Sequence, residues 1–346
     1  VWGGNDKGQL GLADTADRNT PTRLSLPAGA ALIKQIVEGL EHNLALLEDG
    51  QVYVWGDNHK GQLGLGDDAR KFLNTPTRLN LPAGAAPIKQ MVVGAVHSLA
   101  LLENGQVYVW GGNHNGRLGL GHTDNRSTPT RLDLPNEADP IKQMVAGWAH
   151  IVALTNTGQV YVWGGNDKGQ LGLADTADRH TPTPLTFPAG AAPIKQIFAG
   201  SYHSLALLES GQVYVWGWNH NGQLGLGDTD NRNTPTPLKF PDGAAPIKQI
   251  VAGRFHTLAL LENGQVYVWG SNKYGQLGLG DDARKFLNTP TLVSLRPPEL
   301  QQLMSRLEML IPPSSAESSN HAPDDLTPFH ITATAPPAPP TALLQL

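Results

Sequence analysis

Short apolar stretches separated by polar turns follow one another along the chain with a regular period. The triplet Val-Trp-Gly marks this period, and its tryptophans are separated by 53, 55, 53, 53 and 53 residues. They are Trp2, Trp55, Trp110, Trp163, Trp216 and Trp269. Residues 3–18 recur unchanged at 164–179, and residues 67–76 recur at 281–290. Self-similarity at a fixed period predicts tandem structural repeats, and the identical copies indicate recent internal duplication.

Each period contains four short stretches with the pattern of β-strands. In the period from 193 to 240, residues 193–199 alternate between apolar and polar side chains, and residues 203–208 form an apolar run. Residues 212–216 are rich in β-branched and aromatic side chains. Residues 234–238 carry prolines, which restrict them to an edge position. We label these predicted strands A, B, C and D.

These stretches predict an all-β fold. None is longer than about eight residues and none shows sustained helical periodicity, so each repeat is expected to form a four-stranded antiparallel sheet. One such sheet cannot bury its own faces, whereas copies arranged around an axis bury them and leave only short outer edges. We therefore predict a β-propeller over residues 1–295, with five full blades and a partial sixth that lacks strands A and B. An open solenoid is the alternative, which the proline-bearing outer strands disfavour.

Residues 296–346 form a C-terminal extension in which the repeat is absent. Helical spacing of apolar side chains predicts an amphipathic helix near 298–310. These side chains are Leu300, Leu303, Met304, Leu307 and Leu310. The helix is expected to cover the propeller, or alternatively to bind a partner. The rest of the extension is rich in Ser and Pro, which predicts a largely disordered tail.

Composition and charge exclude several functions. The formal net charge is −5 and the Lys and Arg residues are scattered, so we expect no binding to nucleic acid. The chain has no Cys, which excludes disulfides and thiol chemistry. No eighteen-residue apolar run and no signal-peptide pattern occur, so we expect a soluble cytoplasmic or nuclear protein without a membrane span. Phosphate-loop and nucleophile-elbow motifs are also missing, so we expect no intrinsic catalytic residues and no cofactor.

One histidine recurs at the start of strand B in every full repeat. The five are His42, His97, His150, His203 and His256. Equivalent atoms of adjacent propeller blades normally lie too far apart to share a zinc ion, so we expect no metal site. Each histidine is instead expected to hydrogen-bond the backbone at the start of its own strand. A single histidine acting as a general base is the alternative.

Sequence variation among the repeats selects one side of the predicted propeller. In a sheet with strand order A-B-C-D, the A–B and C–D loops emerge on one side, and the B–C and D–A connections on the other. The B–C and D–A connections are nearly the same in every repeat, whereas the A–B and C–D loops differ. The candidate partner-binding residues are Leu40, Glu41, Val96, Trp148, Ser201, Tyr202, Arg254 and Phe255 in A–B loops, and Trp218, His220, Lys273 and Tyr274 in C–D loops.

The residue types in these variable loops point to protein recognition. Aromatic and Arg side chains supply most of the binding energy at protein interfaces. Unconstrained drift of the loops is the alternative, but drift would not favour exposed aromatic side chains, which promote aggregation. We therefore predict that this face binds another protein.

The repeat resembles that of the regulator of chromosome condensation family. The elements of that family stand here as Gly200-Ser201-Tyr202-His203, Trp216-Gly217, Gly222-Gln223-Leu224-Gly225 and Thr234-Pro235, and they recur throughout residues 1–295. The resemblance implies a β-propeller, typically with seven blades, and a guanine nucleotide exchange factor for a small GTPase such as Ran. It also implies that the A–B loop pairs face the GTPase. Exchange factors of the family present acidic residues there, and only Glu41 matches.

Other functions remain open within this resemblance. The main alternative is a non-catalytic scaffold or inhibitor that binds another protein through the aromatic-rich loops. In either case the protein is expected to be a monomer. Ultraviolet-B photoreception uses clustered Trp with Arg at the A–B loops, and it is not expected because only Trp148 occurs there. Near-identical repeats also fit a bacterial protein delivered into host cells, where it would bind a host GTPase.

Overall fold

The computed structural model describes residues 1–67, 71–135, 139–280 and 285–293, and the strands in them form five four-stranded antiparallel sheets. Each sheet corresponds to one predicted A-to-D repeat, which confirms the all-β fold and the four-stranded blades. Blade 1 consists of β1 (Ile33–Glu38), β2 (His42–Leu47), β3 (Val52–Asp57) and β4 (Phe72–Leu79), and blade 2 of β5 (Ile88–Val93), β6 (His97–Leu102), β7 (Val107–Gly111) and β8 (Arg126–Leu132). Blade 3 consists of β9 (Ile141–Ala146), β10 (His150–Thr155), β11 (Val160–Gly164) and β12 (Arg179–Leu185), and blade 4 of β13 (Ile194–Ala199), β14 (His203–Leu208), β15 (Val213–Gly217) and β16 (Arg232–Leu238). Blade 5 consists of β17 (Ile247–Ala252), β18 (His256–Leu261), β19 (Val266–Ser271) and β20 (Phe286–Val293).

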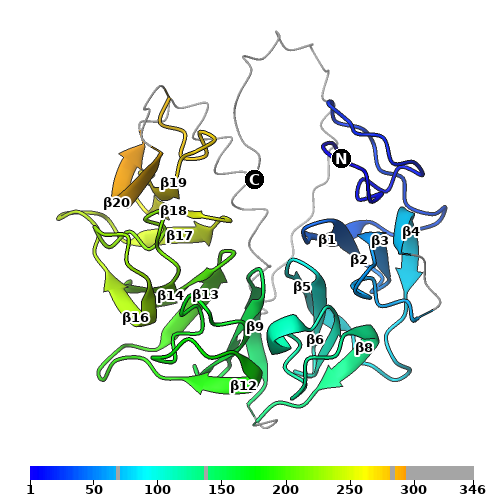
Figure 1. The fold of residues 1–346 in the computed structure, drawn as a ribbon, viewed down its shortest axis with the longest axis horizontal. Coiled ribbons are helices and arrows are strands. Elements are labelled where there is room, and N and C mark those ends of the chain that lie inside the picture. The colour runs from blue at the N-terminus through cyan, green and yellow to red at the C-terminus, as the bar shows by residue number, and fades with distance from the viewer. Residues whose placement is uncertain (68–70, 136–138, 281–284, 294–346) are drawn as a thin grey trace, which may run out of the picture.

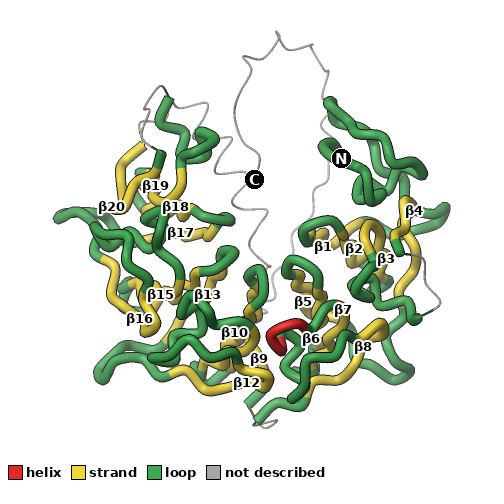
Figure 2. Tube along the Cα trace, in the orientation of Figure 1, coloured by secondary structure: helices red, strands yellow, loops and turns green. Residues whose placement is uncertain are grey.

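The blades follow one another around a common centre, with the A strands β1, β5, β9 and β17 toward the centre and the D strands toward the outside (Figure 1). Helix is limited in the described residues to one 3-10 turn, η1 (His114–Gly116), and loops make up most of the rest (Figure 2). The predicted helix near 298–310, and with it the whole extension 296–346, lies outside the described residues.

Residues 1–32 precede blade 1 and contain the predicted half unit. A single bridge joins Gly3 to Arg18, and the backbone amide of Thr22 donates to the carbonyl of Val1 over 2.8 Å. These two segments correspond to strands C and D of the other repeats. The half unit packs on blade 1, because its Leu24 contributes to the cluster around the buried Trp55. The chain thus begins its described fold with a partial blade, as the repeat pattern predicted.

Tryptophans of the C strands join each blade to the one before it. Trp55, Trp110, Trp163, Trp216 and Trp269 are each completely buried. Their indole N–H groups donate to backbone carbonyls of the preceding repeat over 2.9–3.1 Å. A buried indole normally has a hydrogen-bond partner, and here the same residue type supplies both apolar contact and polar pairing between blades. The Trp of the Val-Trp-Gly triplet therefore connects each blade to the preceding one.

The expectation that the recurring histidines bond the backbone of their own strand was wrong, and three of them instead link adjacent blades. Nε2 of His42, His150 and His203 contacts a hydroxyl of the following blade over 2.9–3.2 Å. The hydroxyl belongs to the residue after the next histidine, at Ser98, Ser204 and Thr257. Each hydroxyl in turn donates to a carbonyl of the preceding repeat. A strand pattern cannot show this pairing, because the partner lies 54 or 56 residues away.

We expect Ser204→Ala to lower the free energy of unfolding by about 1–3 kcal/mol, because it leaves Nε2 of the buried His150 without a partner. Urea unfolding followed by tryptophan fluorescence measures this change. Ser25→Ala is the control, because Ser25 is exposed. Equal unfolding midpoints for the two variants would show that the bond between blades contributes nothing.

Candidate protein-binding face

The A–B loops of successive blades touch one another through their backbones. The backbone amide of Leu40 donates to the carbonyl of Ala95 over 3.2 Å, and the amide of Ala95 donates to the carbonyl of Trp148 over 3.4 Å. In the same way the amide of Trp148 donates to the carbonyl of Ser201 over 2.9 Å, and the amide of Ser201 donates to the carbonyl of Arg254 over 3.2 Å. These bonds place the variable A–B loops of all five blades in one continuous arc.

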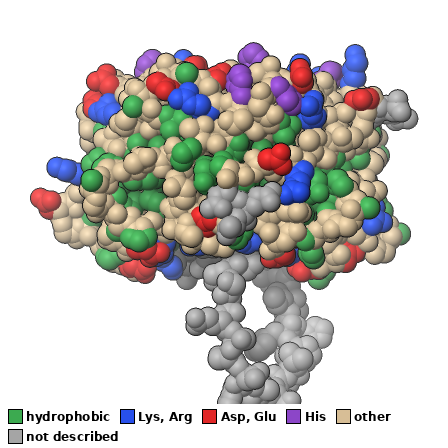
Figure 3. All heavy atoms as spheres, turned by 90° about the horizontal axis from the view of Figure 1, so that it is seen from below, with side chains coloured by type: hydrophobic (Ala, Val, Ile, Leu, Met, Phe, Trp, Pro, Cys, Tyr) green, Lys and Arg blue, Asp and Glu red, His purple; other side chains and the backbone are tan. Residues whose placement is uncertain are grey.

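Each C–D loop starts from the A–B loop of its own blade. The amide of Trp218 donates to the carbonyl of Tyr202 over 2.8 Å, and the amide of Ser271 donates to Phe255 over the same distance. Both variable loop sets therefore lie on the same side of the molecule, which we call the variable face. Of the exposed histidines of the described residues, His59, His114 and His220 belong to C–D connections, and His180 lies at the start of β12, directly after one. Histidine side chains accordingly gather along one edge of the side view in Figure 3.

Five predicted site residues form one contact group, which we call the aromatic cluster: Trp148, Tyr202, Trp218, Arg254 and Phe255. Tyr202 is central, stacked on Trp148 with 6.2 Å between ring centroids and on Phe255 with 6.5 Å. The Trp218 ring stands edge-on to both Tyr202 and Phe255, at 5.7 and 5.3 Å. Such edge-on and stacked pairs are favoured geometries for aromatic rings. The cluster combines loops of blades 3, 4 and 5.

Arg254 connects the two ends of the aromatic cluster. Its guanidinium carbon lies 5.0 Å from the ring centroid of Trp148, two blades away, and 5.1 Å from that of Phe255. Both distances are within the range in which a cation is attracted to an aromatic face. The side chain is nevertheless exposed, as expected for a charge that keeps contact with water. The cluster therefore presents rings and one positive charge together.

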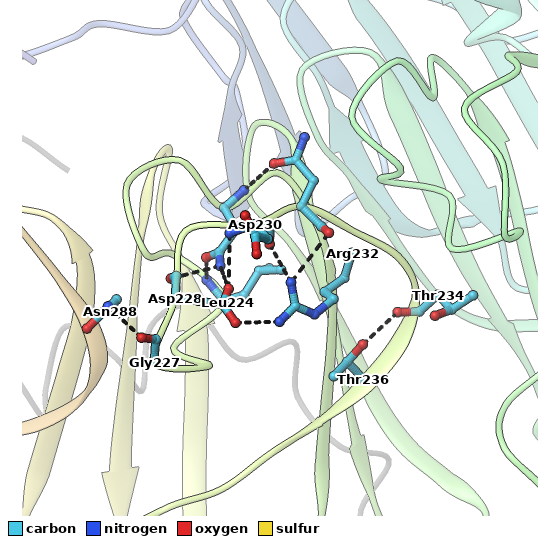
Figure 4. A network of polar contacts seen from close by, with 10 residues as sticks. Leu224, Gly227, Asp228, Asp230, Arg232, Thr234, Thr236 and Asn288 are labelled. Carbon is cyan, nitrogen blue, oxygen red and sulfur yellow. Dashed lines mark hydrogen bonds and ion pairs between the residues drawn. The ribbon is translucent and has the colours of Figure 1, made fainter.

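The C–D loop of blade 4, which carries Trp218, is held by a network of polar contacts (Figure 4). Oδ1 of Asn219 accepts from the amide of Leu224 over 2.9 Å, and Nδ2 of Asn219 donates to the Asp228 carbonyl over 3.1 Å. Arg232 pairs with the Asp228 carboxylate at 2.5 Å, and Asn288 of β20 donates to the Gly227 carbonyl over 2.9 Å. The same Asn and Asp–Arg arrangement holds the loops at 166–179 and 5–18. A repeated frame thus supports loop residues that differ between repeats.

The other predicted site residues lie outside the aromatic cluster. His220 touches its margin, with its ring 5.7 Å from that of Trp218. Lys273 and Tyr274 form a separate pair with 5.2 Å between the ammonium and the ring centroid, and Tyr274 is 82% exposed. Ser201 contributes its backbone to the arc. Leu40, Glu41 and Val96 belong to the A–B loops of blades 1 and 2, on the same arc.

Arg117, a buried cation close to the aromatic cluster, was not among the residues predicted from the sequence. It occupies the position that is Gln in the other Gly-Gln-Leu-Gly motifs, and this departure was the available signal. Its Nε donates to the His114 carbonyl over 2.7 Å. Burial lowers the pKa of Arg117, opposed by the nearby Tyr202 and Asp178. Burial also raises the pKa of Tyr202, as does Asp167, so this phenol is a neutral hydrogen-bond donor at pH 7.

The described residues contain no group of three His, Cys, Asp or Glu side chains placed to hold a metal ion. Within the same residues, no helix is long and apolar enough to cross a membrane. What the variable face offers is shape, aromatic area and charge. These are the properties of a binding surface.

Comparisons with known proteins agree with this architecture. The chain is 36% identical over 292 residues to the ultraviolet-B receptor UVR8 of Arabidopsis thaliana, covering 84% of this chain and 64% of the receptor. The crystal structure of human WBSCR16 superposes with a TM-score of 0.75 at 26% identity, covering 84% of this chain and 76% of that one. Yeast RCC1 (Prp20), in its crystal structure with Kap60 bound, superposes with a TM-score of 0.72 at 28% identity, covering 86% and 72%.

The chain spans less than two thirds of the length of the curated relatives that it matches. A family model described as the RCC1-like domain matches residues 1–308, which include all five blades and the half unit. The chain therefore belongs to the RCC1-like domain family.

Proposed function

We propose that this chain is a protein-binding propeller whose aromatic cluster forms the principal contact with its partner. More specifically, we propose that this partner is a small GTPase. One observation carries the proposal: five side chains from three blades converge on the variable face although the framework beneath them is repeated. Trp, Tyr and Arg are the residue types that most often dominate interface energies. Yeast RCC1 with Kap60 bound supports the use of this fold in protein complexes.

Exchange on a GTPase requires no nucleophile. A propeller face that binds the nucleotide-free GTPase more tightly than the loaded one shifts the equilibrium toward nucleotide release. The A–B arc carries Glu41 as its one acidic side chain, so the arc supports binding more directly than it supports exchange. A scaffold or inhibitor that uses the same cluster is therefore the second candidate. Either activity is proposed for a monomer in the cytoplasm or nucleus, of its own cell or of a host.

A panel of GTPases loaded with a fluorescent nucleotide tests the proposal. We expect at least one GTPase to bind, and we expect Trp148→Ala combined with Tyr202→Ala to weaken that binding about 30-fold or more, because the loss of even one interface anchor costs about 2 kcal/mol. Glu209→Ala combined with Glu262→Ala is the matched control, since both residues are exposed in B–C turns on the other side of the sheets.

The readouts separate the two candidates. Accelerated nucleotide release that the cluster variant loses supports exchange, whereas binding without release supports the scaffold or inhibitor. Absence of both across the panel would exclude the GTPase. Binding of any partner that is equally tight in the cluster variant and the control would exclude the cluster as the contact.

A further inference from the structure

Arg254 has no carboxylate partner among the described residues. Arg18, Arg179 and Arg232 each pair with an Asp four residues earlier, at 2.5–2.6 Å. The guanidinium of Arg254 has no carboxylate within 4.0 Å and no hydrogen bond in the described residues. It is held instead by the rings of Trp148 and Phe255, which contact its charge without using its N–H donors.

The charges around the aromatic cluster leave Arg254 uncompensated. Lys168 pairs with Asp167 at 3.0 Å, and both influence the pKa of Tyr202. Arg117 is linked to Asp178 through Asn115, which accepts from Nη2 of Arg117 and donates to the Asp178 carboxylate. Two cations thus face two carboxylates, and the guanidinium of Arg254 remains as the uncompensated positive charge of the aromatic cluster.

We infer that the partner inserts an aspartate or glutamate carboxylate against Arg254, with a neighbouring apolar side chain on the rings of Tyr202 and Trp218. This inference rests on the proposed function and names the chemistry that the partner must present. A planar guanidinium binds a carboxylate through two parallel N–H···O bonds. The two ring contacts restrict the side chain before binding, so less conformational entropy is lost when the pair forms.

A singly charged group matches this site better than a polyanion. One uncompensated cation neutralises one carboxylate, whereas a phosphate dianion would keep about one negative charge against the nearby Asp167 and Asp178. The apolar ring surface beside the guanidinium also favours a peptide, which supplies an apolar side chain next to its acidic one. A peptide segment of alternating acidic and apolar character therefore fits the cluster.

Selection from a random twelve-residue peptide display library, performed in parallel on the wild-type chain and on Arg254→Gln, tests this inference. We expect peptides selected on the wild type to be enriched in Asp or Glu beside an apolar residue. Synthetic copies of those peptides should bind Arg254→Gln at least tenfold more weakly, and replacing their acidic residue with the matching amide should weaken wild-type binding to a similar extent. Arg78→Gln, an exposed arginine on β4, is the control and should bind like the wild type.

The outcomes distinguish this inference from the proposed function. The selected peptides could be neutral, bind Tyr202→Ala more weakly and bind Arg254→Gln as tightly as the wild type. That result would overturn the inference of an acidic partner and would leave the proposed binding face intact. Phosphorylated copies that bind much more tightly than the carboxylate peptides would also overturn it. A selection that yields no peptide sensitive to any cluster residue would count against the proposed function itself, and the inference would fall with it.

Discussion

Replacing Gly147 with Ala is expected to destabilise the propeller by about 3 kcal/mol or more, or to prevent its folding. A Cβ at this position would lie 2.1 Å from Cε1 of His150 and 2.6 Å from the carbonyl oxygen of Gly200 in the next blade. Neither neighbour can move freely, because the imidazole bonds Ser204 and Gly200 is held by its own bond to His203. The cause is therefore lack of space between blades.

Denaturant unfolding of the variant measures this effect, and Gly4→Ala provides the control. Gly4 also has an ordinary φ, but a Cβ there would meet only the side-chain amide of Gln9, at 3.8 Å. Gly4→Ala is expected to change the unfolding midpoint little. A Cβ on the glycine of every Gly-x-x-His motif would lie 2.0–2.2 Å from Cε1 of that motif's histidine, so Gly94→Ala should behave like Gly147→Ala. Wild-type stability in both would show that the blades do not approach this closely.

Stability should fall steeply as the pH is lowered from 7 to 5, because the histidines between the blades are buried in their neutral form. Burial lowers the pKa of His150 and His203 to about 3 and that of His42 and His256 to about 4. In the unfolded chain these groups titrate near 6.5, so below that pH the unfolded state binds more protons than the folded state. Their stabilising effect is complete above pH 6.5 and is lost progressively toward pH 4 and 3. Each histidine is expected to cost about 2 kcal/mol at pH 5.

Urea midpoints measured at several pH values between 7 and 5 test this expectation. The paired Asp residues have pKa values lowered from 3.8, so they do not contribute to the change in this window. His97→Leu is the informative variant, because Ile151 stands at the repeat position that carries the hydroxyl in other blades, and neither ring nitrogen of His97 has a partner. Burial lowers its pKa well below 6.5, so the variant should show a shallower pH dependence without losing a hydrogen bond. Equal stability at pH 7 and pH 5 in the wild type would contradict buried neutral histidines.

Much of the variable face could be predicted before the structure, and its internal arrangement could not. Divergence of the loops between otherwise repeated units identified Trp148, Tyr202 and Phe255 as candidates. Which of the twelve candidates meet was decided by the angle between neighbouring blades, which brings residues about 53 positions apart within ring-contact distance. The contact between Arg254 and Trp148 spans two repeats, and no local pattern indicates it.

The fold itself follows from the sequence because its determinants are local and repeated. Alternating and apolar runs, glycine turns and proline-bearing edges specify each four-stranded sheet within one period, and copying the period copies the sheet. Contacts between blades are not local, since a hydrogen bond such as that of His150 to Ser204 needs two side chains brought together from different periods. The same separation in sequence explains why Arg117 was not predicted. Its neighbours Tyr202 and Asp178 come from other repeats and lie near it only in the folded protein. The sequence alone thus determined the repeated sheet and the variable side. The tertiary structure decided which side chains connect the blades and which form the aromatic cluster, because those residues meet only after the blades have assembled.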